Sequence, residues 1–153
     1  MSRVESRLAE LGLSLPAAAA PAGSYVPVVR AGSLAFTSGQ LPMAGGVLQN
    51  PGKVGAEVSP EEGYHLAQTC TLNALAALRQ ALGSLDRIVR VVKVVGFVSS
   101  APGFQAQPKV INGASDLLVA VFGEAGQHAR SAVGVAELPL GSAVELELIV
   151  EVE

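Results

Sequence analysis

The most regular hydrophobic pattern in the chain runs through its final residues. From Val144 onward, apolar and acidic positions alternate, and successive side chains of a strand point to opposite faces of a sheet. The pattern therefore predicts a strand with one buried face and one face that carries carboxylates. The predicted buried positions are Val144, Leu146, Leu148, Val150 and Val152, and the other positions are Glu145, Glu147, Ile149, Glu151 and Glu153.

A second strand is predicted just before this one. Arg130 opens it, and the two strands are expected to form a pair joined by a turn. The break between them is Leu138-Pro139-Leu140-Gly141, because Pro cannot donate to a strand ladder and Gly relaxes the turn.

A long helix is predicted in the middle of the chain. Ser59 is the expected N-cap, Pro60 takes the first helical position and Glu62 completes a capping box. The helix should run to about Leu82 and stop at Gly83. Its predicted inner stripe consists of Ala67, Cys70, Ala74, Leu78 and Leu82. Cys70 is therefore expected in the core and not as a reactive thiol.

Two further helices are predicted from weaker hydrophobic patterns. One is predicted from about Phe104 or Pro108 to Val121. A short amphipathic helix is predicted in residues 2–13, followed by a Pro- and Ala-rich linker in residues 15–23.

The remaining apolar segments are predicted strands. Residues 88–98 are almost continuously β-branched, which predicts a central strand buried on both faces. Residues 25–29 and 34–38 are predicted as two short strands around a turn at residues 30–33, and residues 42–55 as a loop or edge strand. The element order predicts an α+β fold in which two helices pack on one face of a mixed sheet.

Composition narrows the class of protein. Half of the 153 residues are hydrophobic and only 15% are charged, so some apolar surface is expected between subunits. The net charge of −3 and the absence of a basic run argue against a nucleic-acid partner. We expect a single domain over residues 1–153, in which residues 1–24 form an N-terminal extension.

The expected location is the cytoplasm. Cys70 is the only cysteine, which excludes an internal disulfide and fits a reducing compartment. No apolar run reaches membrane-spanning length, and the first residues lack the apolar segment of a signal peptide.

Arg130 is the first candidate for chemistry. A planar guanidinium can hold a substrate carboxylate through two parallel charge-assisted bonds, and a glutamate opposite it could position water or move a proton. The alternative is an arginine in a surface ion pair. The two histidines, His65 and His128, have no partners at metal-ligand spacing, so no metal site is predicted.

Two sets of short motifs give these residues a context. Near the C-terminus the chain has Ala129-Arg130-Ser131, then Leu138-Pro139, then Val144-Glu145-Leu146-Glu147. Near the front it has Gly23-Ser24-Tyr25, Arg30-Ala31-Gly32-Ser33-Leu34 and Ser38-Gly39-Gln40. In type, order and spacing the two sets resemble the signatures of the Rid family of reactive-intermediate (enamine/imine) deaminases, also called the YjgF-like or L-PSP family.

The resemblance implies a chorismate-mutase-like fold assembled as a homotrimer, with clefts between subunits. It implies that Arg130 holds the carboxylate of a small 2-imino acid and that Glu145 acts on the reacting water or the imine nitrogen. It also implies that Tyr25, Ser38, Gly39 and Gln40 line the cleft, and that no metal or organic cofactor is needed. Glu147 would then be a structural carboxylate, either paired with a cation such as Arg90 or Lys93 or hydrated within the assembly.

The chain also departs from the family pattern. His128 stands where the family usually has Pro, and Ala132, after Ser131, stands where many members carry Cys or Thr. A family Asn on the second helix is matched by Asn112 or Ser115, and the sequence leaves both open. The candidate substrate contacts therefore include Ser131, Ala132, Asn112 and Ser115. His128 is either a titrating group of the cleft or a solvated histidine at the start of a strand.

Three hypotheses for the function therefore remain. The first is hydrolysis of reactive 2-imino or 2-enamino acids to 2-keto acids. The second is a non-catalytic trimer that binds small carboxylates or keto acids in the same clefts. The third, an endoribonuclease or translation inhibitor, has the acidic charge balance against it.

Overall fold

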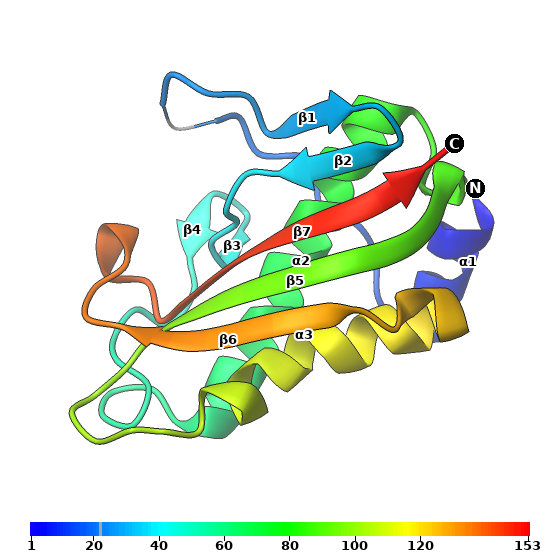
Figure 1. Cartoon of the computed structure of the whole chain (residues 1–153). Helices are drawn as coiled ribbons and strands as arrows, with labels where there is room; N and C mark the ends of the chain where they lie inside the picture. The colour runs from blue at the N-terminus through cyan, green and yellow to red at the C-terminus, as the bar shows by residue number, and fades with distance from the viewer. Residues whose placement is uncertain (22) are drawn as a thin grey trace.

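The computed structural model describes residues 1–21 and 23–153 (Figure 1). The α-helices and strands are α1 (Arg3–Glu10), β1 (Val28–Ala31), β2 (Leu34–Thr37), β3 (Met43–Ala44), β4 (Val47–Leu48), α2 (Pro60–Leu82), β5 (Ile88–Ser99), α3 (Gln107–Phe122), β6 (Ala129–Val135) and β7 (Val144–Val152). Short 3-10 turns are η1 (Leu85–Arg87), η2 (Gly123–Gly126) and η3 (Pro139–Gly141).

Five strands form one mixed sheet in the order β1-β2-β7-β5-β6. Only the β5–β6 pair is parallel; the other neighbours are antiparallel. The prediction that the last two strands pair with each other is wrong, because β5 lies between them. A chain that leaves β6 must cross the end of β5 to enter β7, and the 3-10 turn η3 lies in that crossing.

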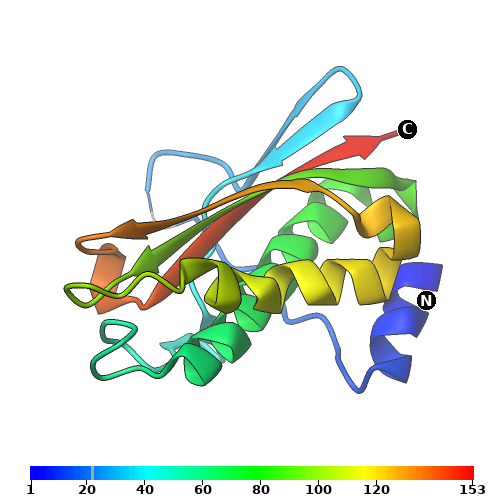
Figure 2. The same ribbon diagram turned by 60° about the horizontal axis from the view of Figure 1, so that its bottom comes forward.

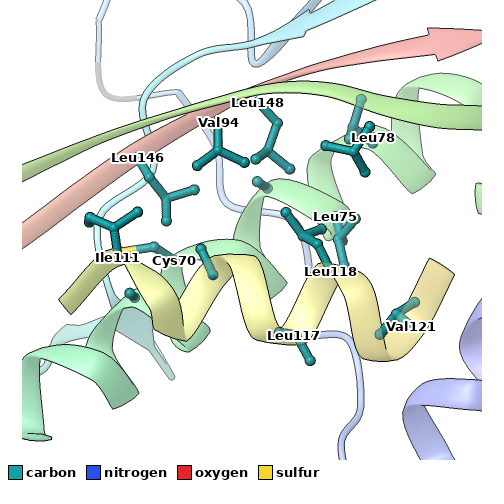
Figure 3. Packing of buried hydrophobic residues seen from close by; sticks show 14 of the residues in the cluster. Cys70, Leu75, Leu78, Val94, Ile111, Leu117, Leu118, Val121, Leu146 and Leu148 are labelled. Carbon is teal, nitrogen blue, oxygen red and sulfur yellow. The ribbon is translucent and has the colours of Figure 1, made fainter. Parts of the chain in front are cut away.

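The helices α2 and α3 cover one face of the sheet, as Figure 2 shows. The predicted alternation of β7 is confirmed, since Val144, Leu146, Leu148, Val150 and Val152 are all buried beneath the helices. Close approach of α3 depends on Gly96 of β5, where a Cβ would lie 2.5 Å from Ile111 Cδ1. Figure 3 shows Cys70 and Leu75 of α2 in this core with Leu118 of α3, so Cys70 is a core residue as predicted.

The start and stop of α2 follow the sequence closely. Ser59 Oγ accepts a hydrogen bond from the Glu62 backbone N–H at 3.0 Å, and Gly83 ends the helix at a φ of 85°. The predicted capping box at this site is only half formed. Glu62 Oε1 accepts from the Ser59 hydroxyl at 3.2 Å, where a full box would have it bind the Ser59 backbone.

The N-terminal helix α1 contributes to the same core. Ser2 and Glu5 form a complete capping box, and Asp86 binds the backbone N–H groups of Arg3 and Val4 at 2.9 and 3.1 Å. Val4 and Leu8 are buried in the core cluster.

The first strand begins later than predicted, whereas β2 begins at Leu34 as predicted. The strand expected from Tyr25 is β1, which starts at Val28, and Arg30 lies within it. The turn is the residue pair Gly32-Ser33, and Gly32 has the positive φ of 62° that a tight hairpin requires. The Gly-rich segment at residues 42–55 forms a separate two-stranded hairpin of β3 and β4, not an edge of the main sheet.

β5 is central in the sheet but is buried on one face only within this chain. Val91, Val94 and Val98 face the helices and are buried, whereas Val95 and Phe97 on the other face are only half-buried. The prediction of burial on both faces is therefore wrong for the single chain. In the described part of the chain, no helix has both the length and the apolar character needed to cross a membrane.

Candidate functional site

Arg130 lies on β6, the edge strand of the sheet, beside Val94 of β5. Its side chain is on the helix-covered side, where its Nη1 donates to Asn112 Oδ1 at 2.8 Å and to Ser115 Oγ at 3.2 Å. In the part of the chain that the structure describes, the hydrogen bonds of Arg130 to other side chains use Nη1 alone. The Nε and Nη2 donors therefore remain for a ligand carboxylate.

Asn112 and Ser115 both contact Arg130, so both candidates lie beside the predicted carboxylate anchor. They are three residues apart on α3, and residues at this spacing lie on the same side of a helix. The two acceptors hold the guanidinium from one side and are half-buried with it.

Glu145 lies on β7 beside Phe97, on the face of the sheet that the helices leave open. Its carboxylate lies directly against Gly39, and a Cβ at position 39 would overlap Glu145 Oε2. Gln40 exchanges two backbone hydrogen bonds with Leu146, at 2.8 and 3.1 Å, which fixes the loop after β2 against β7. This explains why a glycine is required beside the glutamate.

Tyr25 and Ser38 lie on the same side of the molecule as Glu145. The Ser38 hydroxyl donates to the Val26 carbonyl at 2.6 Å and so ties the segment that carries Tyr25 to the end of β2. A surface hollow of about 590 Å³ is lined by Tyr25, Ser38, Gly39, Leu41, Pro139, Leu140 and Glu145. The Gln40 amide donates to the Ser38 carbonyl at 3.4 Å and lines a smaller adjoining hollow.

The carboxyl of Glu145 is electrostatically perturbed. Burial raises its pKa above the ordinary value of 4.5, and the nearby charge of Glu147 raises it further. A half-buried carboxyl with a raised pKa can both accept and return a proton closer to neutral pH than an ordinary glutamate.

The candidate residues fall into two groups on opposite faces of the sheet. The Arg130 group comprises Asn112, Ser115, His128 and Ala132 together with Arg130 on the helix side. The Glu145 group comprises Tyr25, Ser38, Gly39 and Gln40 together with Glu145, and Ser131 of β6 also points to the open side. One chain does not bring the two groups to a common ligand.

His128 precedes β6 and lies next to Ser115, with its Nε2 at 2.8 Å from Ser115 Oγ. It is half-buried, so the interpretation of a fully solvated histidine is wrong. Ala132, which stands where a polar family residue was expected, packs against the hydrophobic core.

Of the two alternatives for Glu147, the pairing with Arg90 or Lys93 is not formed within the described chain. The strand register places Glu147 beside Val95, Arg90 beside Glu151 and Lys93 beside Ile149. Within the described residues, Glu147 forms no ion pair. Arg90 instead donates from Nη2 to the Gln127 carbonyl at 3.2 Å.

Leu140 is a feature of the site region that the sequence interpretation missed. It lies in the hollow beside Glu145, is 75% exposed and has a positive φ of 61°, which is uncommon for a side chain of this size. The sequence predicts only a turn between strands for this segment. An apolar residue between the Pro and Gly of a turn was the available signal.

Within residues 1–21 and 23–153, no group of three or more His, Cys, Asp or Glu side chains could hold a metal ion.

Comparisons with known proteins cover nearly the whole chain. The family model described as "YjgF/chorismate mutase-like, putative endoribonuclease" matches residues 5–152. Protein TCP17 from Trypanosoma cruzi is 50% identical over 152 residues, which span 97% of this chain and 94% of that protein.

Solved structures show the same similarity. The crystal structure of a "putative endoribonuclease" from Shewanella oneidensis MR-1 matches with a TM-score of 0.95 and 41% identity, over 97% of this chain and 99% of that one. RidA from Psychrobacter sp. PAMC 21119 matches with a TM-score of 0.62 and 29% identity, over 88% of this chain and 94% of that one.

Proposed function

Because this chain belongs to the YjgF/chorismate mutase-like family, we propose that it hydrolyses reactive 2-imino and 2-enamino acids to 2-keto acids and ammonia. The observation that carries the proposal is the chemistry of the two half-sites. One presents an arginine with spare donors for a carboxylate, and the other presents a half-buried glutamate of raised pKa beside a hollow.

We propose that the two half-sites meet between subunits of a homotrimer. Arg130 and Glu145 cannot reach one small ligand from the same chain, because the sheet separates them. The open face of the sheet also carries apolar side chains that are poorly covered within one chain. Val29 is 53% exposed, Phe36 is 37% exposed and Val133 is 44% exposed. Such a surface is typical of subunit interfaces.

In the proposed reaction, Arg130 of one subunit holds the substrate carboxylate through its free donors. Glu145 of the partner subunit takes a proton from a water molecule, whose oxygen attacks the imine carbon to give a carbinolamine. The glutamate then returns this proton to the nitrogen. The carbinolamine hydroxyl passes its remaining proton to the nitrogen as the C=O double bond forms and the C–N bond breaks, and ammonia leaves. The products are a 2-keto acid and ammonia, and the glutamate ends in its starting state.

Most of the rate gain in this scheme comes from placement. A 2-imino acid already hydrolyses in water, so holding the carboxylate and the attacking water together supplies much of the acceleration. Proton transfer by Glu145 adds a further factor, on the order of 10²–10⁴ for general acid–base catalysis.

The test uses 2-imino acids produced in situ by an amino-acid oxidase. The release of 2-keto acid and ammonia is compared with and without the protein, and 2-keto-acid binding is measured by calorimetry. Accelerated release supports the proposal. Binding of 2-keto acids without any acceleration would contradict it and favour a non-catalytic binding trimer.

A further inference from the structure

His128 is joined to Arg130 by a short chain of hydrogen bonds. Its Nδ1 lies 2.6 Å from the Gly126 carbonyl oxygen, and its Nε2 lies 2.8 Å from Ser115 Oγ. Ser115 Oγ is in turn 3.2 Å from Arg130 Nη1. The chain therefore runs from the η2 turn through the imidazole and the hydroxyl to the guanidinium.

The chemistry of the partners fixes the direction of each bond. A carbonyl oxygen only accepts, so Nδ1 of His128 carries the proton that it donates to Gly126. In the neutral imidazole, Nε2 is then an acceptor, and the Ser115 hydroxyl donates to it. With its proton committed to His128, the Ser115 oxygen turns a lone pair toward Arg130, which can only donate.

The imidazole is held at a well-packed corner. Gly126 is buried against α3, where a Cβ would overlap the Leu118 carbonyl. The next residue, Gln127, accepts at its carbonyl from Arg90 Nη2 at 3.2 Å. The anchor for His128 is therefore backbone that has little freedom to move.

Charged groups near this corner are few and come from four elements. Arg130 lies on β6, Arg90 and Lys93 lie on β5, and Glu124 lies on η2. On α3, Asp116 follows Ser115 but is engaged by the Tyr64 hydroxyl at 2.8 Å. In the described residues, no ion pair to His128 or Arg130 is formed. The guanidinium is held from this side by two neutral groups, Asn112 at 2.8 Å and the Ser115 end of the relay at 3.2 Å.

We propose that His128 is a positioning residue for the carboxylate anchor. Acting through Ser115, it sets the orientation of Arg130 so that the Nε and Nη2 edge faces the ligand. This inference rests on the proposed function of Arg130. It also accounts for a departure of the sequence, since His128 stands where the resembled family signature has Pro.

Two substitutions separate the relay from a merely structural role. In His128→Gln, the side-chain amide reaches the position of Nε2, so its oxygen can accept from Ser115. In His128→Asn, the shorter amide reaches the position of Nδ1, so it can donate to Gly126 but cannot reach Ser115. A structural role in the η2 corner predicts that Asn preserves function and Gln does not. The relay predicts the reverse.

The readouts are the dissociation constant of a 2-keto acid and the KM and kcat for a 2-imino acid. We expect His128→Asn to raise both the dissociation constant and KM by about tenfold, the usual size for one hydrogen bond to a charged group, with little change in kcat. His128→Gln should stay within about threefold of the wild type. His65→Asn, on the outer side of α2, is the matched control and should behave as the wild type.

A readout without ligand completes the test. In the neutral form of the His128 ring, nitrogen-15 shifts should show a protonated Nδ1 and an unprotonated Nε2, and Ser115→Ala should move the Nε2 signal. A protonated Nε2 in the neutral ring would overturn the relay.

The outcomes also separate this inference from the proposed function. Equal losses in the Asn and Gln variants, in a wild type that binds 2-keto acids, would overturn the relay alone. A wild type that neither binds 2-keto acids nor hydrolyses 2-imino acids would contradict both.

Discussion

Arg130 and Glu145 lie on opposite faces of the same five-stranded sheet. Arg130 shares the helix-covered face with its neighbour Val94, whereas Glu145 shares the open face with its neighbour Phe97. The strand β5 runs between the two strands that carry them. A ligand that needs both side chains must therefore bind between two copies of the chain.

Arg130→Ala should remove the carboxylate anchor. We expect kcat/KM for a 2-imino acid to fall by about 100-fold or more, because charge-assisted hydrogen bonds to the ligand are lost. Arg130→Lys should recover little of this, since Lys cannot present a planar fork. Circular dichroism should show an unchanged fold, and Arg30→Ala in the exposed strand β1 is the control. Full activity in Arg130→Ala would show that the anchor lies elsewhere.

Glu145→Gln should lower turnover while leaving 2-keto-acid binding intact. The amide keeps the shape of the side chain but cannot carry a proton, so kcat should fall by about 10²–10⁴-fold. Glu147→Gln, two residues along the same face of β7, should keep its turnover. If Glu147→Gln loses turnover while Glu145→Gln keeps it, the catalytic glutamate is Glu147, which lies two residues further along β7.

The same substitution should change the pH dependence of stability. Burial raises the pKa of Glu145 above 4.5, so the folded chain binds this proton more tightly than the unfolded chain. Stability should therefore fall as pH rises from 4.5 through the raised folded value. Above that window Glu145→Gln should melt at a higher temperature than the wild type. The difference should vanish below pH 4.5, and thermal melts at pH 4 and pH 8 measure it.

Gly39→Ala should disturb the glutamate without unfolding the chain. The new methyl group would overlap Glu145 Oε2, but that atom is the end of a flexible side chain that can turn away. We expect stability to change by under about 1 kcal/mol and turnover to fall by about 100-fold as the carboxylate is displaced. In the Glu145→Gln background, Gly39→Ala should cost no further turnover. An additive loss there would mean that Gly39 acts on something other than Glu145.

Local signals in the sequence predicted the elements well. Ser59 and Gly83 mark the ends of α2 because capping and left-handed backbone are determined by neighbouring residues. The alternation after Val144 predicted the buried face of β7 for the same reason. The strand order could not be obtained in this way, because the insertion of β5 between β6 and β7 is a long-range pairing that leaves no trace in local alternation.

The same limit applies to the candidate site, because local motifs predict its residues but not their arrangement in the sheet. The motifs identify Arg130 and Glu145, but the face that each occupies follows from strand register. Register also corrected the expected partner of Glu147, because Arg90 lies beside Glu151. The contact of His128 with Ser115 joins the start of β6 to α3, and no spacing rule within a single element predicts it.

The most direct test of a site shared between chains is a mixing experiment with two inactive variants. Chains carrying Arg130→Ala and chains carrying Glu145→Gln are co-expressed, the mixed assemblies are purified, and 2-imino-acid hydrolysis is measured against each variant alone. Each mixed trimer should have an intact Arg130 beside an intact Glu145 of the partner subunit in one of its three clefts, so about a third of the wild-type activity should return. If mixed assemblies that contain both chains are no more active than the separate variants, the two residues do not act together across a subunit boundary.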